Sequence, residues 1–408
     1  MDYRLDPEDE KYRQELKAWL EKIFPKDEPP PKRDTIEDAK KAYKNYQRRL
    51  FEGGYAGIRY PKEYGGQEGT MIHEMIVAEE LTPYGRDHAA DINAIGMGMA
   101  LPTIEAVGTK EQKDMFIRKL LDGTHIWVQA FSEPNAGSDV AACSTRAVKK
   151  GDHYIVNGQK IWTTYAQYAD WTLLLVRTNP DKPKHRGLSY LLVDLKAPGV
   201  EIRPIKQITG ESEFNEIFFD DVKVPVNMLV GQEDEGWSIA LTTLMFERVM
   251  GDLSIANMLK MMFDGQLVMA HDVKKEGKPA LEDPLIRQKM AKCYSDLMVL
   301  KYTGLRNFSK VFGGGIPGSE GSIGKLLWSQ LQVDMSELAM EIQGPYNQLL
   351  KDSPLSIADG LFQYSYLSAR GSVIAAGTTE VMKNIIGERV LGLPKDMARA
   401  QISKTEKS

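Results

Sequence analysis

The spacing of apolar residues changes at two places along the chain and predicts three regions of different structure. Up to residue 123, apolar residues such as Leu16, Leu20 and Ile23 recur at the spacing of an amphipathic helix. Breaks rich in Pro and Gly separate the helical stretches, and Thr109 is placed to cap the last of them before it ends at Gly123. The other predicted helices begin at residue 7, before a Pro-rich break at 27–33, and then cover 36–51, 74–81 and 94–107.

Between residues 124 and 231 the pattern changes to a period of two. WTLLLVRT, LSYLLVDL and NEIFFDDVKV are apolar or β-branched runs bounded by Gly, Pro and Asp, which is typical of strands. HYIVNG and QKIWTT are predicted to be two short strands joined by a turn at Asn157-Gly158, because Asn-Gly is the strongest short-range hairpin signal. The region is long enough for a small barrel or sandwich.

From residue 232 onward the chain again has a helical pattern. The predicted helices at 238–271, 284–311 and 322–343 are long and rich in Leu and Met, which favours a bundle that also packs against other subunits. The predicted fold class is therefore α+β and multi-domain. It has an N-terminal helical domain at 1–123, a middle β-barrel or sandwich domain at 124–231, and a C-terminal four-helix-bundle domain at 232–408.

Composition narrows the class of protein. The net charge of −5 argues against nucleic acid or an anionic membrane as the main partner. Two cysteines, Cys143 and Cys293, indicate a reducing compartment without a disulfide framework. The first residues are charged, and no run of about 18 apolar residues occurs, so a cytoplasmic protein without a membrane span is predicted. No metal site is predicted.

Three ordered stretches resemble the acyl-CoA dehydrogenase family. FSEPNAGSDVAA at 131–142, followed by NGQKIWTTYAQYADW at 157–171, is similar to the flavin-binding middle domain of that family. EFNEIFFDDVKVPVNMLVG at 213–231 resembles the end of the same domain, and GTTEVMKNIIGERVLGLP at 377–394 resembles the C-terminal segment. The resemblance covers nearly the whole chain and implies a flavoprotein of lipid β-oxidation. In this family FAD oxidises an acyl-CoA thioester to its trans-2-enoyl form. A carboxylate removes the α-proton, N5 of FAD takes the β-hydride, and an electron-transfer flavoprotein accepts the electrons.

The resemblance offers two positions for the carboxylate base. The more familiar one precedes the Gly-Thr of the C-terminal motif, but here Ala376 stands before Gly377, and a methyl group cannot carry a proton. Its backbone N–H can still donate to the thioester oxygen. The second position lies on the first long helix of the C-terminal domain, where Glu247 matches the base and Arg248 matches a family arginine beneath the site. The apolar neighbours indicate a buried stretch, where a glutamate is unusual unless it is functional; an ordinary solvent-facing Glu-Arg pair is the alternative.

The resemblance also implies the residues that contact FAD and the substrate. The expected FAD contacts are Gln129, Ala130, Phe131, Ser132, Ser138, Trp162, Thr163, Thr164, Thr378 and Glu380. The expected substrate contacts are Ser138, Met245, Phe246, Arg248, Ala376 and Gly377. Each hydroxyl alone is weak evidence, because a hydroxyl in a turn usually caps that turn. Their shared order and spacing carry the prediction.

Two family motifs that contact a neighbouring subunit's FAD are eroded in this sequence. HDVKKEGKP at 271–279 replaces the Arg-x-x-Phe-Gly motif, whose arginine suits a pyrophosphate. The Gln-x-x-Gly-Gly-x-Gly segment survives only as QGPYN at 343–347. Two assemblies remain open. One is an α₂β₂ heterotetramer with a related chain, and the other is a homotetramer in which Lys274 or Lys275 contacts the pyrophosphate.

The substrate and the reaction type also leave alternatives. Ala375 and Ala376 free space beside the substrate, so bulky, branched or ring-bearing acyl-CoA thioesters are as plausible as straight chains. An acyl-CoA oxidase-like flavoprotein is one alternative to a dehydrogenase. A non-catalytic subunit of a heteromeric acyl-CoA dehydrogenase is another, which Ala376 supports and Glu247 opposes.

Overall fold

The structure is a computed structural model that describes residues 5–25, 27–85, 88–312 and 318–395; side chains at 247–252 and 311–312 lie outside the description. The chain divides into two compact units, Met1–Glu247 and Arg248–Ser408, which are described in turn. The first unit contains the N-terminal helices and the β-sheet. The second contains most of the C-terminal helices.

The N-terminal helices follow the predicted pattern closely. They are α1 (Pro7–Ile23), α2 (Ile36–Glu52), α3 (Met71–Gly85), α4 (Leu101–Val107) and α5 (Lys110–Leu121). The Asp6 side chain caps α1 by accepting from the backbone N–H groups of the first turn. Thr109 caps α5 in a capping box with Gln112, as predicted. The stretch predicted as one helix from residue 94 instead enters α4 through a π-helical turn at Gly96–Ala100.

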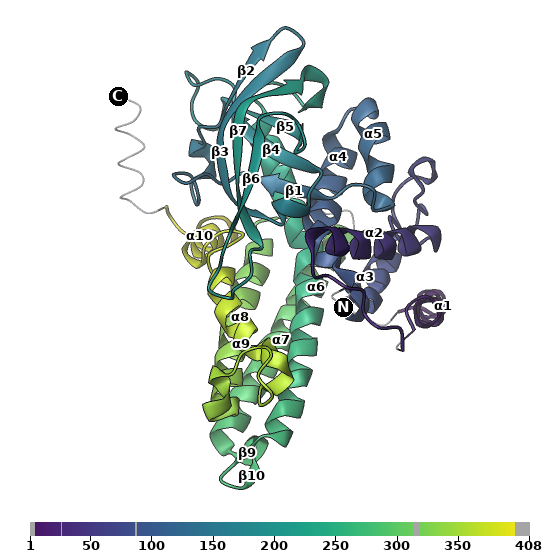
Figure 1. Cartoon of the computed structure of the whole chain (residues 1–408), viewed down its shortest axis with the longest axis vertical. Coiled ribbons are helices and arrows are strands. Elements are labelled where there is room, and N and C mark those ends of the chain that lie inside the picture. Colours follow the sequence, from purple (N-terminus) through teal and green to yellow (C-terminus); the bar gives the residue numbers. More distant parts are fainter. Residues whose placement is uncertain (1–4, 26, 86–87, 313–317, 396–408) are drawn as a thin grey trace. The chain divides into compact units, whose positions relative to one another are not determined.

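The middle of the chain forms an eight-stranded sheet within the described residues. Its strands are β1 (Trp127–Ala130), β2 (Arg146–Lys150), β3 (His153–Thr164), β4 (Trp171–Arg177), β5 (Leu188–Asp194), β6 (Val200–Ile205), β7 (Phe214–Pro225) and β8 (Leu229–Val230). The spatial order is β6-β7-β3-β2-β4-β5-β8, and β1 pairs in parallel with β4. The long strands β3 and β7 lie side by side in Figure 1. Consecutive residues of β4 and β5 are buried, so both faces of these strands are covered and belong to the core.

The predicted hairpin at Asn157-Gly158 is wrong. β3 runs without a break through both residues, and only a register shift against β7 marks the place. The actual hairpin joins β2 to β3 at Gly151-Asp152, where Gly151 adopts φ +64°. Gly158 is glycine for a different reason, because a Cβ there would lie 2.7 Å from the Cα of Thr145.

The second unit is dominated by a helical bundle. Its helices are α6 (Gly236–Asp272, which begins in the first unit), α7 (Pro284–Phe312), α8 (Gly321–Gln343) and α9 (Leu361–Ser372), followed by the short α10 (Thr379–Ile385). α7, α8 and α9 run alongside one another in Figure 1 and share a core that includes Leu297, Met335 and Phe362. A two-stranded ribbon of β9 (Lys274–Lys275) and β10 (Lys278–Pro279) connects α6 to α7.

The predicted fold class is confirmed, with a helical N-terminal part, a middle β-sheet and a helical C-terminal part. Where the chain is described, every helix is too short or too polar to span a bilayer.

Candidate active site

Strand β1 carries the first predicted FAD contacts and lies in the core of the sheet. Asn93 holds its start by accepting from the backbone N–H of Trp127 at 2.8 Å. Gln129 is half-buried, whereas Ala130 and Phe131 are buried. The Phe131 ring packs edge-on against Tyr190 at a centroid distance of 5.7 Å. The position of the following loop is therefore set by the sheet.

The end of β3 carries the second set of predicted contacts in an irregular backbone. Trp162 adopts φ +61°, which is uncommon for a bulky residue, and its side chain is 56 % exposed. The pairing of β3 with β7 shifts register between Lys160 and Thr163, which turns the indole out of the sheet. Beside it Thr164 is half-buried, while Thr163 is buried and its Oγ1 has no hydrogen-bond partner in the described part of the chain.

Two hydrogen bonds bring these segments together. The backbone N–H of Ile161 donates to the Ser132 carbonyl at 3.0 Å. The Lys160 ammonium donates to the Phe131 carbonyl at 3.0 Å. The structure therefore places Phe131, Ser132 and the Trp162–Thr164 segment next to one another.

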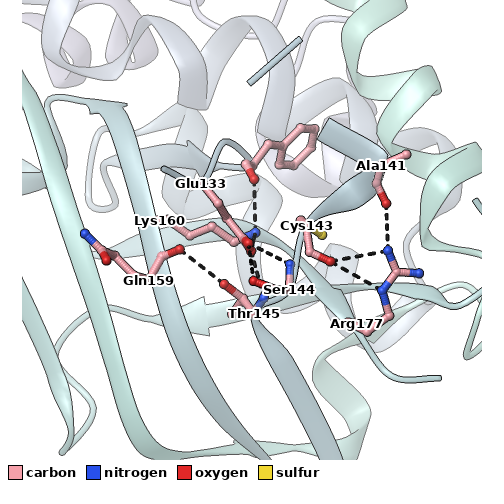
Figure 2. A network of polar contacts seen from close by, with 9 residues as sticks. Glu133, Ala141, Cys143, Ser144, Thr145, Gln159, Lys160 and Arg177 are labelled. Carbon is pink, nitrogen blue, oxygen red and sulfur yellow. Dashed lines mark hydrogen bonds and ion pairs between the residues drawn. The ribbon is translucent and has the colours of Figure 1, made fainter. Parts of the chain in front are cut away.

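A buried ion pair lies beneath this junction and was missed by the sequence analysis. Lys160 Nζ lies 2.8 Å from Glu133 Oε1, with the two side chains 0 % and 5 % exposed (Figure 2). Burial by itself would raise the pKa of Glu133. The Lys160 charge and the hydrogen bonds from Thr145 and Ser144 outweigh burial and hold that pKa at about 2. The sequence held one signal for this pair, which is a lysine within a strand of otherwise alternating pattern. A lysine that is buried in a strand is expected to have a charged partner, because buried lysines are rare unless they are paired.

The second half of the loop is held by Arg177 on β4. Its guanidinium donates to the carbonyl oxygens of Ala141 (2.6 Å) and Cys143 (3.3 Å), as Figure 2 shows. Ser138 is exposed, and the adjacent Asp139 forms an ion pair with Lys184 at 2.8 Å. Ser138 is thus presented to solvent on a loop whose far end is fixed by a planar, multidentate donor.

The start of α6 is anchored by a chain of buried hydroxyl groups. Thr243 Oγ1 accepts from Thr103 Oγ1 at 3.0 Å and lies 2.9 Å from the Tyr190 hydroxyl. Met245 and Phe246 follow on the same helix and are half-buried rather than buried. Glu247 and Arg248 continue α6, but their side chains lie outside the described residues.

The remaining predicted residues belong to the second unit. Ala376 is exposed and adopts φ +52°, and Gly377 adopts φ +93°. Thr378 is the N-cap of α10 and accepts from the Val381 backbone N–H at 3.2 Å, which is the ordinary capping role of a hydroxyl. Glu380 is exposed in the first turn of that helix.

These features fit a flat ligand with polar edges, as the isoalloxazine of FAD is. Trp162 offers a large exposed aromatic face, and the neighbouring Thr163 Oγ1 is buried without a partner among the described residues. Gly137 has open space around its Cβ position, so the loop backbone is accessible to a ligand. No group of three His, Cys, Asp or Glu side chains suited to a metal ion occurs in the part of the chain that is described.

Comparison with known proteins identifies the family of each part of the chain. Family models for the N-terminal, middle and C-terminal domains of acyl-CoA dehydrogenase match residues 6–124, 129–222 and 234–391. Acyl-CoA dehydrogenase IpdE1 of Mycolicibacterium smegmatis is 37 % identical over 366 residues, covering 86 % of this chain and 88 % of the relative.

Solved structures give the same result. The ChsE4-ChsE5 complex from Mycobacterium tuberculosis superposes with a TM-score of 0.81 at 29 % identity, covering 97 % of this chain and 100 % of the other. The structure described as Tcur3481-Tcur3483 steroid ACAD has a TM-score of 0.82 at 25 % identity, with coverage of 97 % and 100 %. With three matched domains, a relative of this identity and a shared fold, the chain belongs to the acyl-CoA dehydrogenase family and is an acyl-CoA-oxidising enzyme of that family.

Proposed function

We propose that this enzyme dehydrogenates a bulky or ring-bearing acyl-CoA thioester between its α- and β-carbons, with Glu247 removing the α-proton. FAD, when bound, supplies the acceptor for the β-hydride. The observation that carries this proposal is Ala376 at the familiar base position, combined with a carboxylate at the alternative position on α6. A base is indispensable because the α-proton of a thioester is only weakly acidic.

The anchoring of α6 supports a catalytic role for Glu247. Thr243 lies one helical turn before it, and its hydroxyl is hydrogen-bonded to side chains from α4 and β5. This fixes the helix backbone one turn before Glu247. A base held on a fixed helix needs little reorganisation during proton transfer. Arg248 is proposed to hold the geometry of the site from below.

The backbone at Ala376 supports the complementary role of stabilising the thioester oxygen. Its φ of +52° and that of Gly377 at +93° form a tight left-handed turn, an arrangement that exposes successive N–H groups. The N–H of Ala376 is proposed to donate to the thioester oxygen, where charge develops as the α-proton leaves. The small, exposed side chains of Ala375 and Ala376 leave room for a wide acyl group.

The substrate class also draws on the named relatives. One structural neighbour is described as a steroid ACAD, at 25 % identity over nearly the whole chain. We therefore propose a fused-ring or similarly bulky acyl group attached to CoA. An electron-transfer flavoprotein is the proposed electron acceptor. The oxidase alternative predicts rapid turnover with oxygen and stoichiometric peroxide instead.

We further propose that the working assembly contains a second, related chain. Two structural neighbours support this proposal because their descriptions name two components each, Tcur3481-Tcur3483 and the ChsE4-ChsE5 complex. In this chain Lys275 pairs with Asp283 at 2.5 Å, so binding a neighbour's pyrophosphate would require it to leave that carboxylate. Apolar side chains also remain exposed along α6 and α7, as expected for helices that pack against another subunit. They include Met258, Met261, Val268, Leu285, Tyr294 and Val299.

Glu247→Gln tests the base. The enzyme is mixed anaerobically with a panel of straight-chain and ring-bearing acyl-CoA thioesters, and bleaching of the flavin absorption is followed. The variant keeps the shape of the side chain, so it should bind FAD and thioester but reduce the flavin about 10² to 10⁴-fold more slowly. Asp264→Asn is the matched control, because Asp264 lies on the same helix and is paired only with Lys260 in the described structure. Wild-type rates in Glu247→Gln would refute the assignment.

The assembly is tested by expressing the chain alone and together with a related chain. The heteromer proposal expects poor FAD retention by the lone chain and about one FAD per pair of chains after co-expression. Full flavin occupancy and activity in the lone chain would favour the homotetramer. A protein that takes up no FAD in any assembly would refute the enzymatic proposal as a whole.

A further inference from the structure

Lys160 is buried completely, and its ammonium group donates to two acceptors within the first unit. It donates to the Phe131 carbonyl at 3.0 Å and to Glu133 Oε1 at 2.8 Å. Both acceptors lie in the segment 131–136, here called the flavin loop. Because Lys160 itself belongs to β3, a single side chain joins this loop to the strand that ends in Trp162.

Glu133 extends the connection to a third segment. Its Oε1 also accepts from the backbone N–H of Thr145 at 2.8 Å, and its Oε2 accepts from the backbone N–H and hydroxyl of Ser144 at 2.6 and 2.8 Å. Within the loop, Glu133 and Ala136 exchange backbone hydrogen bonds at 3.1 and 3.0 Å. The carboxylate therefore fixes both ends of the segment between 133 and 145 (Figure 2).

The Lys160–Glu133 ion pair lies where the regular pairing of β3 with β7 is interrupted. Lys160 is opposite Ile217 in the last regular pair before the register shift, and regular pairing resumes only at Thr163. Trp162 sits between them with φ +61°, a sparsely populated conformation that persists only where the surroundings enforce it. Contacts from the flavin loop supply that enforcement, through Lys160 and through the Ile161–Ser132 hydrogen bond.

We propose that Lys160 and Glu133 are positioning residues for flavin recognition, which set the relative geometry of the flavin loop and Trp162 without touching the flavin themselves. The inference rests on the proposed function, because it takes Phe131, Ser132 and the Trp162–Thr164 segment as the flavin contacts. The competing role is that of an ion pair that stabilises the fold and does nothing specific for the ligand.

The chain offers a second ion pair with a buried carboxylate, which separates the two roles, although its lysine, Lys196, is 67 % exposed. Asp170 is 7 % exposed on its side chain, lies 2.6 Å from Lys196 and accepts from the backbone N–H of Ile126 at 3.0 Å. It holds the start of β1 rather than the flavin loop. Removing Lys160 leaves the buried Glu133 carboxylate without its lysine. Removing Lys196 leaves Asp170 with only the longer contact to Lys40 at 3.8 Å, so both changes should lower stability. Only the first should alter flavin binding if Lys160 acts in positioning.

The test compares Lys160→Met with Lys196→Met in the assembly that binds FAD. Each protein is stripped of flavin, FAD is titrated back, and the dissociation constant, the fine structure of the flavin absorption band and the melting temperature are measured. Lys160→Met should weaken FAD binding roughly ten- to hundredfold, as expected when contact groups move by about 1 Å, and should change the band shape. Lys196→Met should change the melting temperature alone. Equal FAD affinity and band shape in the two variants would overturn the proposal.

A second pair of variants keeps the test decisive if Lys160→Met does not fold. Lys160→Met combined with Glu133→Gln removes both charges, so the core contains no unpaired ion. The flavin loop still lacks the hydrogen bonds from the Lys160 ammonium. Hydrogen exchange of residues 131–136 is then measured in the flavin-free proteins. If residues 131–136 exchange faster in the double variant than in Asp170→Asn, Lys160 and Glu133 hold the flavin loop in place. This result does not depend on FAD binding. Failure of the wild type to bind FAD would refute the proposed function separately. If exchange of residues 131–136 in the double variant equals that of the wild type, Lys160 and Glu133 do not position the flavin loop.

Discussion

Replacing Thr243 by valine should destabilise the first unit strongly, although the two side chains have nearly the same shape. Thr243, Thr103 and Tyr190 are all fully buried and come from α6, α4 and β5. Their hydroxyl groups form one chain with separations of 3.0 and 2.9 Å, and Thr243 also donates to the Ile239 carbonyl at 3.0 Å. Valine keeps the packing but removes the central hydroxyl of that chain.

The expected cost follows from the groups left behind. The Thr103 and Tyr190 hydroxyls would both lose the partner that the described structure provides, in a place that water does not reach. Each unsatisfied buried hydroxyl costs about 1–3 kcal/mol. The additional methyl group of valine offsets a small part of this, so a total loss of roughly 2–4 kcal/mol is expected. For a unit of this size the melting temperature should fall by roughly 5–10 °C.

Differential scanning calorimetry measures the effect, with Thr242→Val as the control. Thr242 is the preceding residue on α6 and is half-buried, and its hydroxyl only donates to the Ser238 carbonyl of its own helix at 3.1 Å. That substitution should change the stability by no more than about 0.5 kcal/mol. Adding Tyr190→Phe to Thr243→Val removes the Tyr190 hydroxyl, one of the two that lose their partner. The double variant should therefore lose less stability than the sum of the losses in Thr243→Val and Tyr190→Phe.

Equal melting temperatures for Thr243→Val and Thr242→Val would refute this reasoning. So would strict additivity in the double variant, because it would mean that the Tyr190 hydroxyl does not depend on Thr243. A normal melting temperature combined with slow flavin reduction would point to a direct role of Thr243 in the reaction rather than in anchoring α6.

Other predictions concern single contacts. Asn93→Ala should cost about 2–4 kcal/mol, because Asn93 is fully buried and bonds the backbone on both sides of the start of β1; a thermal melt within 1 °C of wild type would contradict this. The depressed pKa of Glu133 contributes stability that is present above its unfolded value of 4.5 and is lost as the pH falls toward about 2. The melting temperature should therefore fall less between pH 6 and pH 3 in Glu133→Gln than in the wild type. Parallel curves of melting temperature against pH would contradict this prediction. Gly66→Ala should destabilise the protein, since the new Cβ would lie 2.0 Å from the Tyr60 carbonyl oxygen. Gly371→Ala should be neutral or stabilising by up to about 1 kcal/mol, because its Cβ would meet open space on a helix, and urea titrations measure both effects.

The helices could be read from the sequence because their signals are local. The spacing of Leu16, Leu20 and Ile23 requires only a period of 3.6 residues, and Thr109 acts on backbone groups three residues away. The long helices of the C-terminal region were predicted to within a few residues for the same reason. The family resemblance likewise depends on the order of residues along the chain. It supplied the proposed flavin contacts Phe131, Ser132 and Trp162, whose segments are hydrogen-bonded to each other in the structure.

The details of the site depended on which strands became neighbours, and no local pattern contains that information. Asn157-Gly158 has the composition of a turn, yet its glycine serves the close approach of Thr145 from the segment before β2. The sequence offered no partner for Lys160, which the fold places 2.8 Å from Glu133. A charge in the core is tolerable only with a partner that is itself desolvated and hydrogen-bonded, and that partner lies 27 residues away in sequence. Local periodicity therefore determined the helices, whereas contacts between distant segments decided the chemistry around the proposed flavin site.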